Sequence, residues 1–225
     1  GDYYVIVLAP NSVQEMADFM DLAFDLAFKY RNPAMILSDG VIGQMMEKVV
    51  LPPMKPRRTE DEIRRECPWA TIGRTPDRDI NIMTSLELQS EVMEQRNIHL
   101  QKKYDVIKEN EVRFEKTNLD DADYVIVAFG SVARISEKAV ELAREEGIKV
   151  GLFRPITLWP FPEKEIAELA KTKKGFLVAE LNAGQMIEDV RLAVNGETKV
   201  AHFGRLGGMV PDPEEIVNAL KEELL

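Results

Sequence analysis

The polar residues that could do chemistry stand where apolar segments of strand length end, in the second half of the chain. Eight positions share this placement: Gly130, Ser131, Arg154, Glu180, Asn182, Gly184, Gln185 and Arg205. In open α/β sheets, ligands and partners meet the carboxyl ends of the strands. We therefore treat these eight residues as candidates for a binding site or a subunit contact.

Glu180 is a carboxylate at the end of an apolar run, which leaves two roles open. It could act as a general acid or base. It could instead be an orienting acceptor that pairs with Arg154 or Arg205 across the edge of the sheet. We favour the structural pair.

Gly130 and Ser131 follow an apolar run and open a helical segment. The amides at such a helix start could bind an anion. However, no GxGxxG motif follows a strand and no GxxxxGK[ST] motif occurs in the sequence, so both standard nucleotide-binding loops are absent. Plain capping of the helix by Ser131 is favoured.

The remaining metal or acid–base candidates have simpler interpretations. Asp39 precedes Gly40, and a turn is favoured over a divalent-metal role. His99 lies in a charged helical stretch and is interpreted as a surface or interface residue. His202 stands between Ala201 and Phe203, which favours a hydrogen-bonded histidine in a strand. No Ser/His/Asp set, metal-ligand cluster or paired-carboxylate motif stands out in the sequence.

A strand–helix–strand unit positions the first of these candidates. Residues 124–129 form an apolar run without alternation, typical of a strand covered on both faces. The next segment carries Ile135, Ala139 and Leu142 at helical spacing. Gly147 then suits the end of that helix, and residues 149–153 form the second strand. Together they predict a right-handed βαβ unit.

Similar alternation continues to the end of the chain. Strands and helices alternate at least four times over residues 119–225, which predicts an open, doubly wound, mainly parallel α/β domain. Residues 1–50 hold a single strand–helix–strand unit. Residues 51–118 are rich in proline and charge and are predicted to be a linker followed by a bridging helix.

The helix predicted over residues 12–30 begins at a capping-box match between Ser12 and Glu15. Its polar residues fall in one narrow stripe, so it is apolar over most of its circumference. Such a helix is covered on more than one side. A second domain or subunit, or deep burial in the core, explains this pattern equally well.

In the linker, basic and acidic residues are interleaved, which favours a solvated surface over an anion clamp at Arg57 and Arg58. A further capping-box match runs from Thr84 to Glu87. It predicts a helix that continues to about Glu115 as a bridge between two domains.

Composition excludes several classes of function. The net charge of −10 argues against nucleic acid as a bulk electrostatic partner. No apolar run approaches the roughly 20 residues of a membrane span. Cys67 is the only cysteine, which predicts a reducing, cytoplasmic setting and excludes an iron–sulfur cluster held by this chain alone. The chain starts in a buried-type strand without Met, so we expect it to be a piece of a longer polypeptide.

Three segments together resemble a known family. They are Gly-Asp-Tyr-Tyr-Val-Ile-Val-Leu-Ala-Pro-Asn-Ser-Val-Gln-Glu (1–15) with Asn-Pro-Ala-Met-Ile-Leu-Ser-Asp (32–39), Leu-Phe-Arg-Pro-Ile-Thr-Leu-Trp-Pro-Phe-Pro (152–162), and Val-Ala-Glu-Leu-Asn-Ala-Gly-Gln-Met (178–186) with Gly207 and Gly208. The chain resembles the α subunit of 2-oxoacid:ferredoxin oxidoreductases, nearest to the 2-ketoisovalerate and 2-oxoglutarate types.

The resemblance implies that residues 1–50 are the tail of a pyrimidine-binding thiamine diphosphate domain. It implies that residues 119–225 are similar to the transketolase C-terminal domain. The family decarboxylates a 2-oxoacid on thiamine diphosphate with Mg²⁺, passes electrons through iron–sulfur clusters to ferredoxin, and hands the acyl group to coenzyme A.

By the same resemblance, the family's catalytic carboxylate and substrate-binding residues lie upstream of Gly1. The diphosphate and metal site belongs to another subunit or domain, and the clusters belong to partner chains. No catalytic, cofactor-binding or metal-binding residue is therefore assigned here. We expect a scaffold and subunit-interface role beside a β subunit, in an oligomer that involves neither nucleic acid nor membrane.

Two other functions remain open from the sequence. The first is another thiamine-dependent enzyme, such as transketolase or a 2-oxoacid dehydrogenase β chain. The second is a non-catalytic, flavodoxin-like binding or interaction module. The sequence does not name the 2-oxoacid.

Overall fold

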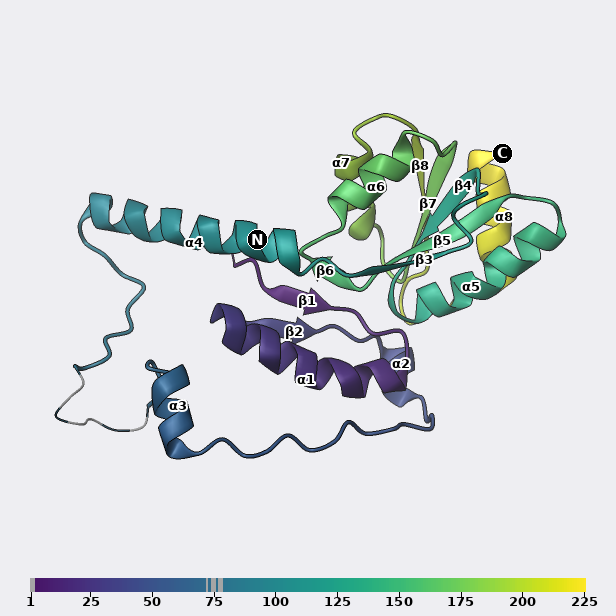
Figure 1. Ribbon diagram of the computed structural model, residues 1–225. Helices are drawn as coiled ribbons and strands as arrows, with labels where there is room; N and C mark the ends of the chain where they lie inside the picture. Colours follow the sequence, from purple (N-terminus) through teal and green to yellow (C-terminus); the bar gives the residue numbers. More distant parts are fainter. Residues whose placement is uncertain (1–2, 72, 74–75, 77–78) are drawn as a thin grey trace. The chain divides into compact units, whose positions relative to one another are not determined.

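The structure is a computed structural model that describes residues 3–71, 73, 76 and 79–225 (Figure 1). It divides into two compact units, Gly1–Leu51 with Tyr104–Leu225, and Pro52–Lys103. The elements are β1 (Ile6–Leu8), α1 (Val13–Tyr30), β2 (Ala34–Ile36), α2 (Gly40–Gln44), α3 (Glu60–Glu66), α4 (Ser90–Asn110), β3 (Phe114–Thr117), β4 (Tyr124–Val127), α5 (Gly130–Glu145), β5 (Val150–Pro155), β6 (Thr157–Trp159), α6 (Glu163–Ala170), β7 (Gly175–Glu180), α7 (Met186–Val194), β8 (Lys199–Gly204) and α8 (Pro213–Leu224). The domain boundaries predicted from the sequence, at residues 50/51 and 118/119, stay predictions.

The larger sheet of the first unit has the strand order β3-β5-β4-β7-β8. Strands β5, β4, β7 and β8 are parallel, and β3 runs antiparallel to β5 at one edge. The predicted doubly wound, mainly parallel α/β architecture is therefore confirmed. The second predicted strand extends beyond its expected end at residue 153, because Arg154 and Pro155 still pair with β3.

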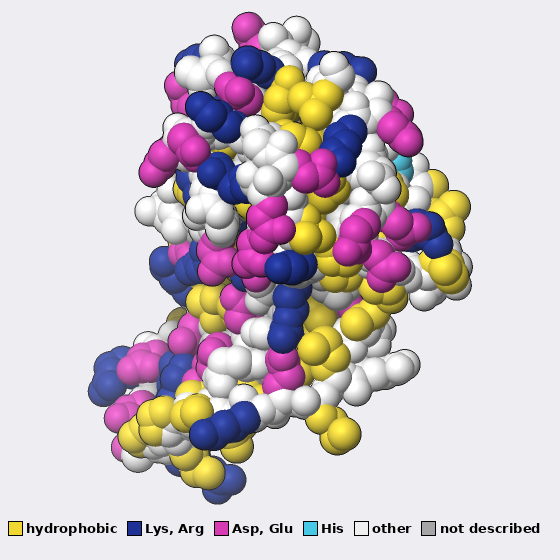
Figure 2. All heavy atoms as spheres, turned by 90° about the vertical axis from the view of Figure 1, so that its right-hand side faces the viewer, with side chains coloured by type: hydrophobic (Ala, Val, Ile, Leu, Met, Phe, Trp, Pro, Cys, Tyr) yellow, Lys and Arg dark blue, Asp and Glu magenta, His cyan; other side chains and the backbone are white. Residues whose placement is uncertain are grey.

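Both faces of this sheet are covered, as the unbroken apolar strands predicted. Ile126 and Ala128 pack with α5 and α8, whereas Val125 and Val127 pack with α6 and α7. Figure 1 shows these two helix pairs on opposite sides of the strands. On the side that carries α5 and α8, acidic and basic side chains are interspersed over the surface (Figure 2). Gly147 ends α5 with a positive φ of 85°, as expected.

A second sheet, of order β2-β1-β6, joins the first residues of the chain to the middle of the sequence. Strands β1 and β2 are parallel and flank α1, which confirms the predicted strand–helix–strand unit. Strand β6 pairs antiparallel with β1, with Val7 opposite Trp159 and Leu8 opposite Thr157. The segment from β5 through β6 therefore belongs to both sheets. Strand β6 was not among the predicted strands, because three residues between prolines carry little strand signal.

Helix α1 begins as predicted, since the N–H of Glu15 donates to Ser12 Oγ at 3.2 Å. Phe19 and Leu26 are buried, but deep burial of the whole helix is contradicted. Met20, Phe24 and Phe28, spaced four residues apart, are about half exposed and form one apolar line that we call the α1 stripe. The exposure of Met20 and Phe24 is compatible with the other predicted explanation, contact with a second domain or subunit.

In the second unit, α3 is capped by Thr59 and Glu62. The helix predicted from Thr84 is wrong at both ends, since α4 begins at Ser90 and ends at Asn110. Thr84 Oγ1 accepts instead from the N–H of Leu86 at 3.2 Å, which makes a local turn. Beyond the C-terminal end of α4, residues 114–117 form β3 instead of a further helical turn. Two of its four residues are charged and exposed, so the sequence carried no apolar strand pattern there.

Candidate functional site

At the carboxyl edge of the larger sheet, residues near the start of the chain meet residues from its middle. Arg154, at the end of β5, is buried and supplies the first contact. Its Nη2 donates to Glu15 Oε2 of α1 at 2.5 Å, and its Nη1 donates to Glu115 Oε2 of β3 at 2.7 Å. Glu15 Oε2 also accepts from the N–H of Asn11 at 2.9 Å. The predicted partnership of Arg154 with Glu180 is therefore wrong.

Glu180, at the end of β7, is a buried helix cap. Its Oε2 accepts from the N–H groups of Gln185 and Met186 at 3.2 and 2.8 Å, and its Oε1 accepts from the N–H of Ile187 at 3.1 Å. These are the free donors at the start of α7, where a carboxylate is also favoured by the helix dipole. The predicted structural role of Glu180 is therefore correct, but the predicted arginine partners are wrong, because the donors are backbone N–H groups.

Asp39 lies between the starts of two helices. Its Oδ1 accepts from the N–H groups of Val41 and Ile42, and its Oδ2 accepts from the N–H of Ser131 at 2.7 Å. The predicted turn at Asp39 is thus the cap of α2. The predicted capping by Ser131 is wrong, because its buried Oγ has no hydrogen-bond partner among the described residues. Gly130 has a φ of 63°, and a Cβ there would lie 2.7 Å from Asp39 Oδ2.

The other candidates also serve local structure. Asn182 Oδ1 accepts from the N–H of Gly184 at 2.8 Å, and Gln185 leads exposed into α7. Arg205 Nη1 donates to Glu215 Oε1 at 2.6 Å, so its predicted pairing with Glu180 is wrong. These residues flank the same sheet edge, but neither Arg154 nor Arg205 reaches Glu180.

The two histidines make no catalytic set. His202 Nε2 lies 3.7 Å from Glu180 Oε1 and has no hydrogen-bond partner among the described residues, which contradicts the expected hydrogen-bonded histidine. His99 is exposed on α4, as expected. No three His, Cys, Asp or Glu side chains in the described ranges are arranged to hold a metal ion.

A buried carboxylate outside the eight candidates adds a further link between α1 and the sheet. Glu111 Oε1 accepts from Lys29 Nζ at 2.7 Å and from Tyr30 Oη at 2.5 Å, and its Oε2 accepts from Arg113 Nη2 at 2.9 Å. Burial works to raise the pKa of Glu111, but the hydrogen bonds from Lys29, Tyr30 and Arg113 outweigh it and lower that pKa. No sequence signal marked this cluster, because Lys29 and Tyr30 lie over 80 residues from Glu111 in the sequence.

A hollow of about 180 Å³ opens beside Glu180, between α7 and the loops that follow β4 and β6. Apolar side chains such as Phe129 and Phe161 line it together with Gln185 and Asp189. Partial burial, and then the carboxylates of neighbouring glutamates, raise the pKa of Asp189. A carboxyl of raised pKa in a hollow is a candidate proton donor or acceptor that sequence analysis missed.

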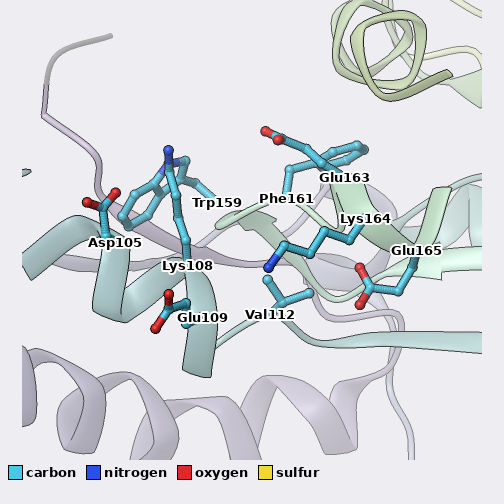
Figure 3. A pocket seen from close by; sticks show the side chains of 9 residues that line it. All are labelled: Asp105, Lys108, Glu109, Val112, Trp159, Phe161, Glu163, Lys164 and Glu165. Carbon is cyan, nitrogen blue, oxygen red and sulfur yellow. The ribbon is translucent and has the colours of Figure 1, made fainter. Parts of the chain in front are cut away.

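A larger hollow of about 440 Å³ lies between the end of α4 and the start of α6 (Figure 3). Trp159 and Phe161 contribute its aromatic wall, and the amine of Lys164 points toward Val112 in its middle. Its charged side chains are of both signs: Asp105, Lys108, Glu109, Glu163, Lys164 and Glu165. The lining therefore selects neither an anionic nor a cationic ligand.

Comparison with known families assigns both halves of the chain. Residues 2–112 match the family described as pyruvate flavodoxin/ferredoxin oxidoreductase, thiamine-diphosphate-binding. Residues 122–216 match the family described as pyruvate:ferredoxin oxidoreductase core domain II. Within the described ranges, no helix is both long enough and apolar enough to span a membrane.

Individual relatives agree with these matches. The chain is 44% identical over 222 residues to the ketoisovalerate oxidoreductase subunit VorB of Methanothermobacter marburgensis, covering 99% of this chain and 61% of the relative. It is 34% identical over 241 residues to the 2-oxoglutarate synthase subunit KorA of Methanocaldococcus jannaschii, covering 98% and 64%. The chain thus spans about three-fifths of the length of the curated relatives it matches.

Among solved structures, a 2-oxoglutarate:ferredoxin oxidoreductase from Magnetococcus marinus matches with a TM-score of 0.76 at 24% identity. The match covers 100% of this chain and 43% of that chain, and it shows a shared fold. The two family matches and the relatives bear out the resemblance carried by the three sequence segments. The chain belongs to the 2-oxoacid:ferredoxin oxidoreductase family.

Proposed function

We propose that this chain is part of a subunit of a thiamine-diphosphate-dependent 2-oxoacid:ferredoxin oxidoreductase that acts on 2-ketoisovalerate. The observation that carries the proposal is the 44% identity to a ketoisovalerate oxidoreductase subunit over nearly the whole chain. Identity to the 2-oxoglutarate synthase subunits is lower, at 30–34%. The reaction is an oxidative decarboxylation that yields an acyl-coenzyme A and reduces ferredoxin.

Within that enzyme, the chain acts as scaffold and subunit interface. Arg154, Glu180 and Arg205 are each committed to partners inside the chain, and Asp39 occupies the amides at the start of α5. The bonds of Arg154 to Glu15 and of Asp39 to Ser131 hold residues 1–51 against the larger sheet, whereas Glu180 and Arg205 hold α7 and α8. Met20 and Phe24 of the α1 stripe are exposed, which supports a contact of this helix with a further part of the enzyme.

The described residues do not fit thiamine diphosphate with Mg²⁺. Mg²⁺ beside a diphosphate needs one or two free carboxylates. The carboxylates at the carboxyl edge of the sheet, Glu15, Asp39 and Glu180, already bind partners inside the chain. We expect the cofactor, and Mg²⁺ with it, to bind elsewhere in the complete enzyme. Iron–sulfur clusters belong to partner chains, because Cys67 is the only cysteine in this sequence.

The test is reconstitution of the complete enzyme. The full-length chain, assembled with its β subunit and thiamine diphosphate, should reduce viologen or ferredoxin in the presence of 2-ketoisovalerate and coenzyme A. A well-assembled complex that stays inactive with every 2-oxoacid would refute the proposal. The 225-residue chain alone should bind no thiamine diphosphate in calorimetry, and micromolar binding would contradict its role as a scaffold.

A second candidate substrate is 2-oxoglutarate, favoured by the KorA relatives and the matching fold. The two substrates separate in the same assay by the ratio of their kcat/KM values. We place the enzyme in the cytoplasm, as an oligomer of several subunits, on the strength of the single cysteine and the subunit names of the relatives.

A further inference from the structure

The hollow of about 180 Å³ beside Glu180 lies where the chain leaves two neighbouring strands toward opposite faces of the larger sheet. Strands β4 and β7 pair side by side, and the chain runs from β4 into α5 on one face and from β7 into α7 on the other (Figure 1). In open α/β sheets, the two loops part at such a switch point and leave a crevice that binds ligands. Phe129 follows β4, Asn182 follows β7, and both line the hollow. Its place in the fold is therefore that of a ligand site.

The inner wall of the hollow is apolar. Phe161 and Met186 belong to the buried cluster between the sheet and the helices α6 and α7, and they are 9% and 4% exposed. Phe129 and Leu158 are half-buried and complete this wall. A dry apolar cavity of about 150 Å³ holds one benzene molecule. A volume of about 180 Å³ therefore accepts an apolar group of about six carbons with a small polar head.

The lining also carries polar side chains that have no partner among the described residues. Gln185 and Asp189 are exposed, lie four residues apart where α7 begins, and so share one side of that helix. Neither side chain makes a hydrogen bond or an ion pair with another described residue. By contrast, both oxygens of Glu180 already accept backbone N–H groups. Of the two carboxylates among the described residues of the lining, Asp189 is therefore the one available to a ligand.

The charge of the lining selects a cation. Among the described residues that line the hollow, none is a lysine, arginine or histidine, whereas two are carboxylates. Burial, and then the carboxylates of three neighbouring glutamates, raise the pKa of Asp189, and a cation beside Asp189 would offset both effects. A cleft lined by one sign of charge concentrates ions of the opposite sign, and aromatic rings such as Phe129 and Phe161 attract cations to their faces. The same field repels carboxylates and phosphates.

We propose that this hollow binds a small organic amine, which is a protonated primary amine carried on an apolar group of about six carbons. The Asp189 carboxylate and the side-chain oxygen of Gln185 accept hydrogen bonds from the ammonium group, and Phe161 and Met186 contact the apolar group. This inference does not rest on the proposed function, whose 2-oxoacid substrate carries the opposite charge.

The test compares three ligands of nearly equal size and different charge: benzylamine, benzyl alcohol and benzoate. Each is titrated into the full-length chain at about pH 7, where benzylamine is a cation, and binding is followed by methyl NMR. We expect benzylamine to bind with a Kd of about 1 mM, which lies within the ligand efficiencies of small molecules. Benzyl alcohol should bind at least about 5-fold more weakly, and benzoate should not bind measurably. The methyl signals of Met186 and Leu158 should shift in proportion to the bound benzylamine.

Two single variants show whether Asp189 carries the preference for the cation. Asp189→Asn removes one charge from the lining, whereas Glu188→Gln removes one charge from the adjacent position, which does not line the hollow. Because both side chains are exposed on α7, both variants should fold. We expect Asp189→Asn to weaken benzylamine binding about 5-fold and to leave benzyl alcohol binding unchanged. We expect Glu188→Gln to change benzylamine binding by less than about 2-fold.

Three results would overturn this inference. A folded chain in which benzylamine leaves the methyl signals of Met186 and Leu158 unmoved would overturn the site. Binding in the hollow that is tightest for benzyl alcohol or for benzoate would overturn the amine as its ligand. An equal loss of benzylamine affinity in both variants would trace the preference to the acidic surface in general and would overturn the role of Asp189. These measurements concern binding alone, so their outcome is independent of 2-oxoacid activity.

Discussion

Replacement of Arg154 by Met tests whether the contacts at the carboxyl edge of the sheet are structural. The Arg154 side chain is 3% exposed and bonds to Glu15 and Glu115, which are 21% and 52% exposed. Met preserves most of the packing of the aliphatic stem and removes the charge and its hydrogen bonds. The change therefore measures the contribution of the ion pairs separately from that of side-chain packing.

The expected cost follows from the exposure of the two partners. Breaking a fully buried ion pair costs about 3–5 kcal/mol, whereas an exposed pair contributes about 0–1 kcal/mol. Glu15 lies closer to the first case and Glu115 to the second. Glu15 also retains its bond from the N–H of Asn11, which lessens the cost of leaving it without Arg154. We expect Arg154→Met to lower the free energy of unfolding by about 2–3 kcal/mol.

Urea unfolding followed by circular dichroism measures this loss, and double-mutant cycles divide it. The coupling between Arg154 and Glu15, measured with Glu15→Gln, should be about 1.5–2.5 kcal/mol. The coupling between Arg154 and Glu115, measured with Glu115→Gln, should stay below about 1 kcal/mol. A loss under about 0.5 kcal/mol for Arg154→Met, or the larger coupling with Glu115, would refute the reasoning.

Three further predictions concern other positions of the chain. Gly130→Ala should cost about 2–3 kcal/mol in urea unfolding, because φ is positive and the new Cβ meets Asp39 Oδ2; a neutral result would contradict this contact. Glu111→Gln should lose stability relative to the unmodified chain at pH 7. The pKa of Glu111 is lowered in the folded chain, because the bonds from Lys29 and its other partners outweigh burial. The difference in free energy of unfolding between Glu111→Gln and the unmodified chain should therefore shrink as pH falls below about 4, where Glu111 becomes protonated. A difference that does not change with pH would contradict this explanation. Asp189→Asn should be slightly more stable than the unmodified chain at pH 7, by less than about 1 kcal/mol, because burial raises the pKa of Asp189 and disfavours its charged form; the gain should disappear below about pH 4, and a loss at pH 7 would refute it.

The parts of the fold that follow from local patterns could be predicted from the sequence. Three local patterns each predicted the structure in which they lie: the unbroken apolar run of β4, the helical spacing in α5, and the glycine at 147 after the helix. Strands β3 and β6 could not be predicted in this way, because β3 is partly exposed and polar and β6 has three residues. Their strand character comes from pairing with β5 and β1.

The hydrogen-bond and ion-pair partners of the candidate residues could not be predicted from the sequence. Arg154 and Glu15 are 139 residues apart, and Asp39 and Ser131 are 92 apart, so only the folded chain brings them together. Glu180 was placed correctly at a strand end. Its acceptance of three backbone N–H groups depends on how α7 enters the fold, and the residue types alone do not encode that.

The central claim is that the polar groups at the strand ends of this chain hold the scaffold together, while the reacting groups lie elsewhere in the enzyme. The most direct test is kcat of the assembled oxidoreductase that carries Glu180→Gln, measured well below its thermal midpoint. We expect kcat to stay within about 2-fold of the unmodified enzyme, while the free energy of unfolding of the chain falls by about 1–3 kcal/mol through the weakened cap of α7. A loss of kcat of about 100-fold or more in a fully assembled, stable enzyme would contradict the claim, because that is the scale of a lost general acid or base.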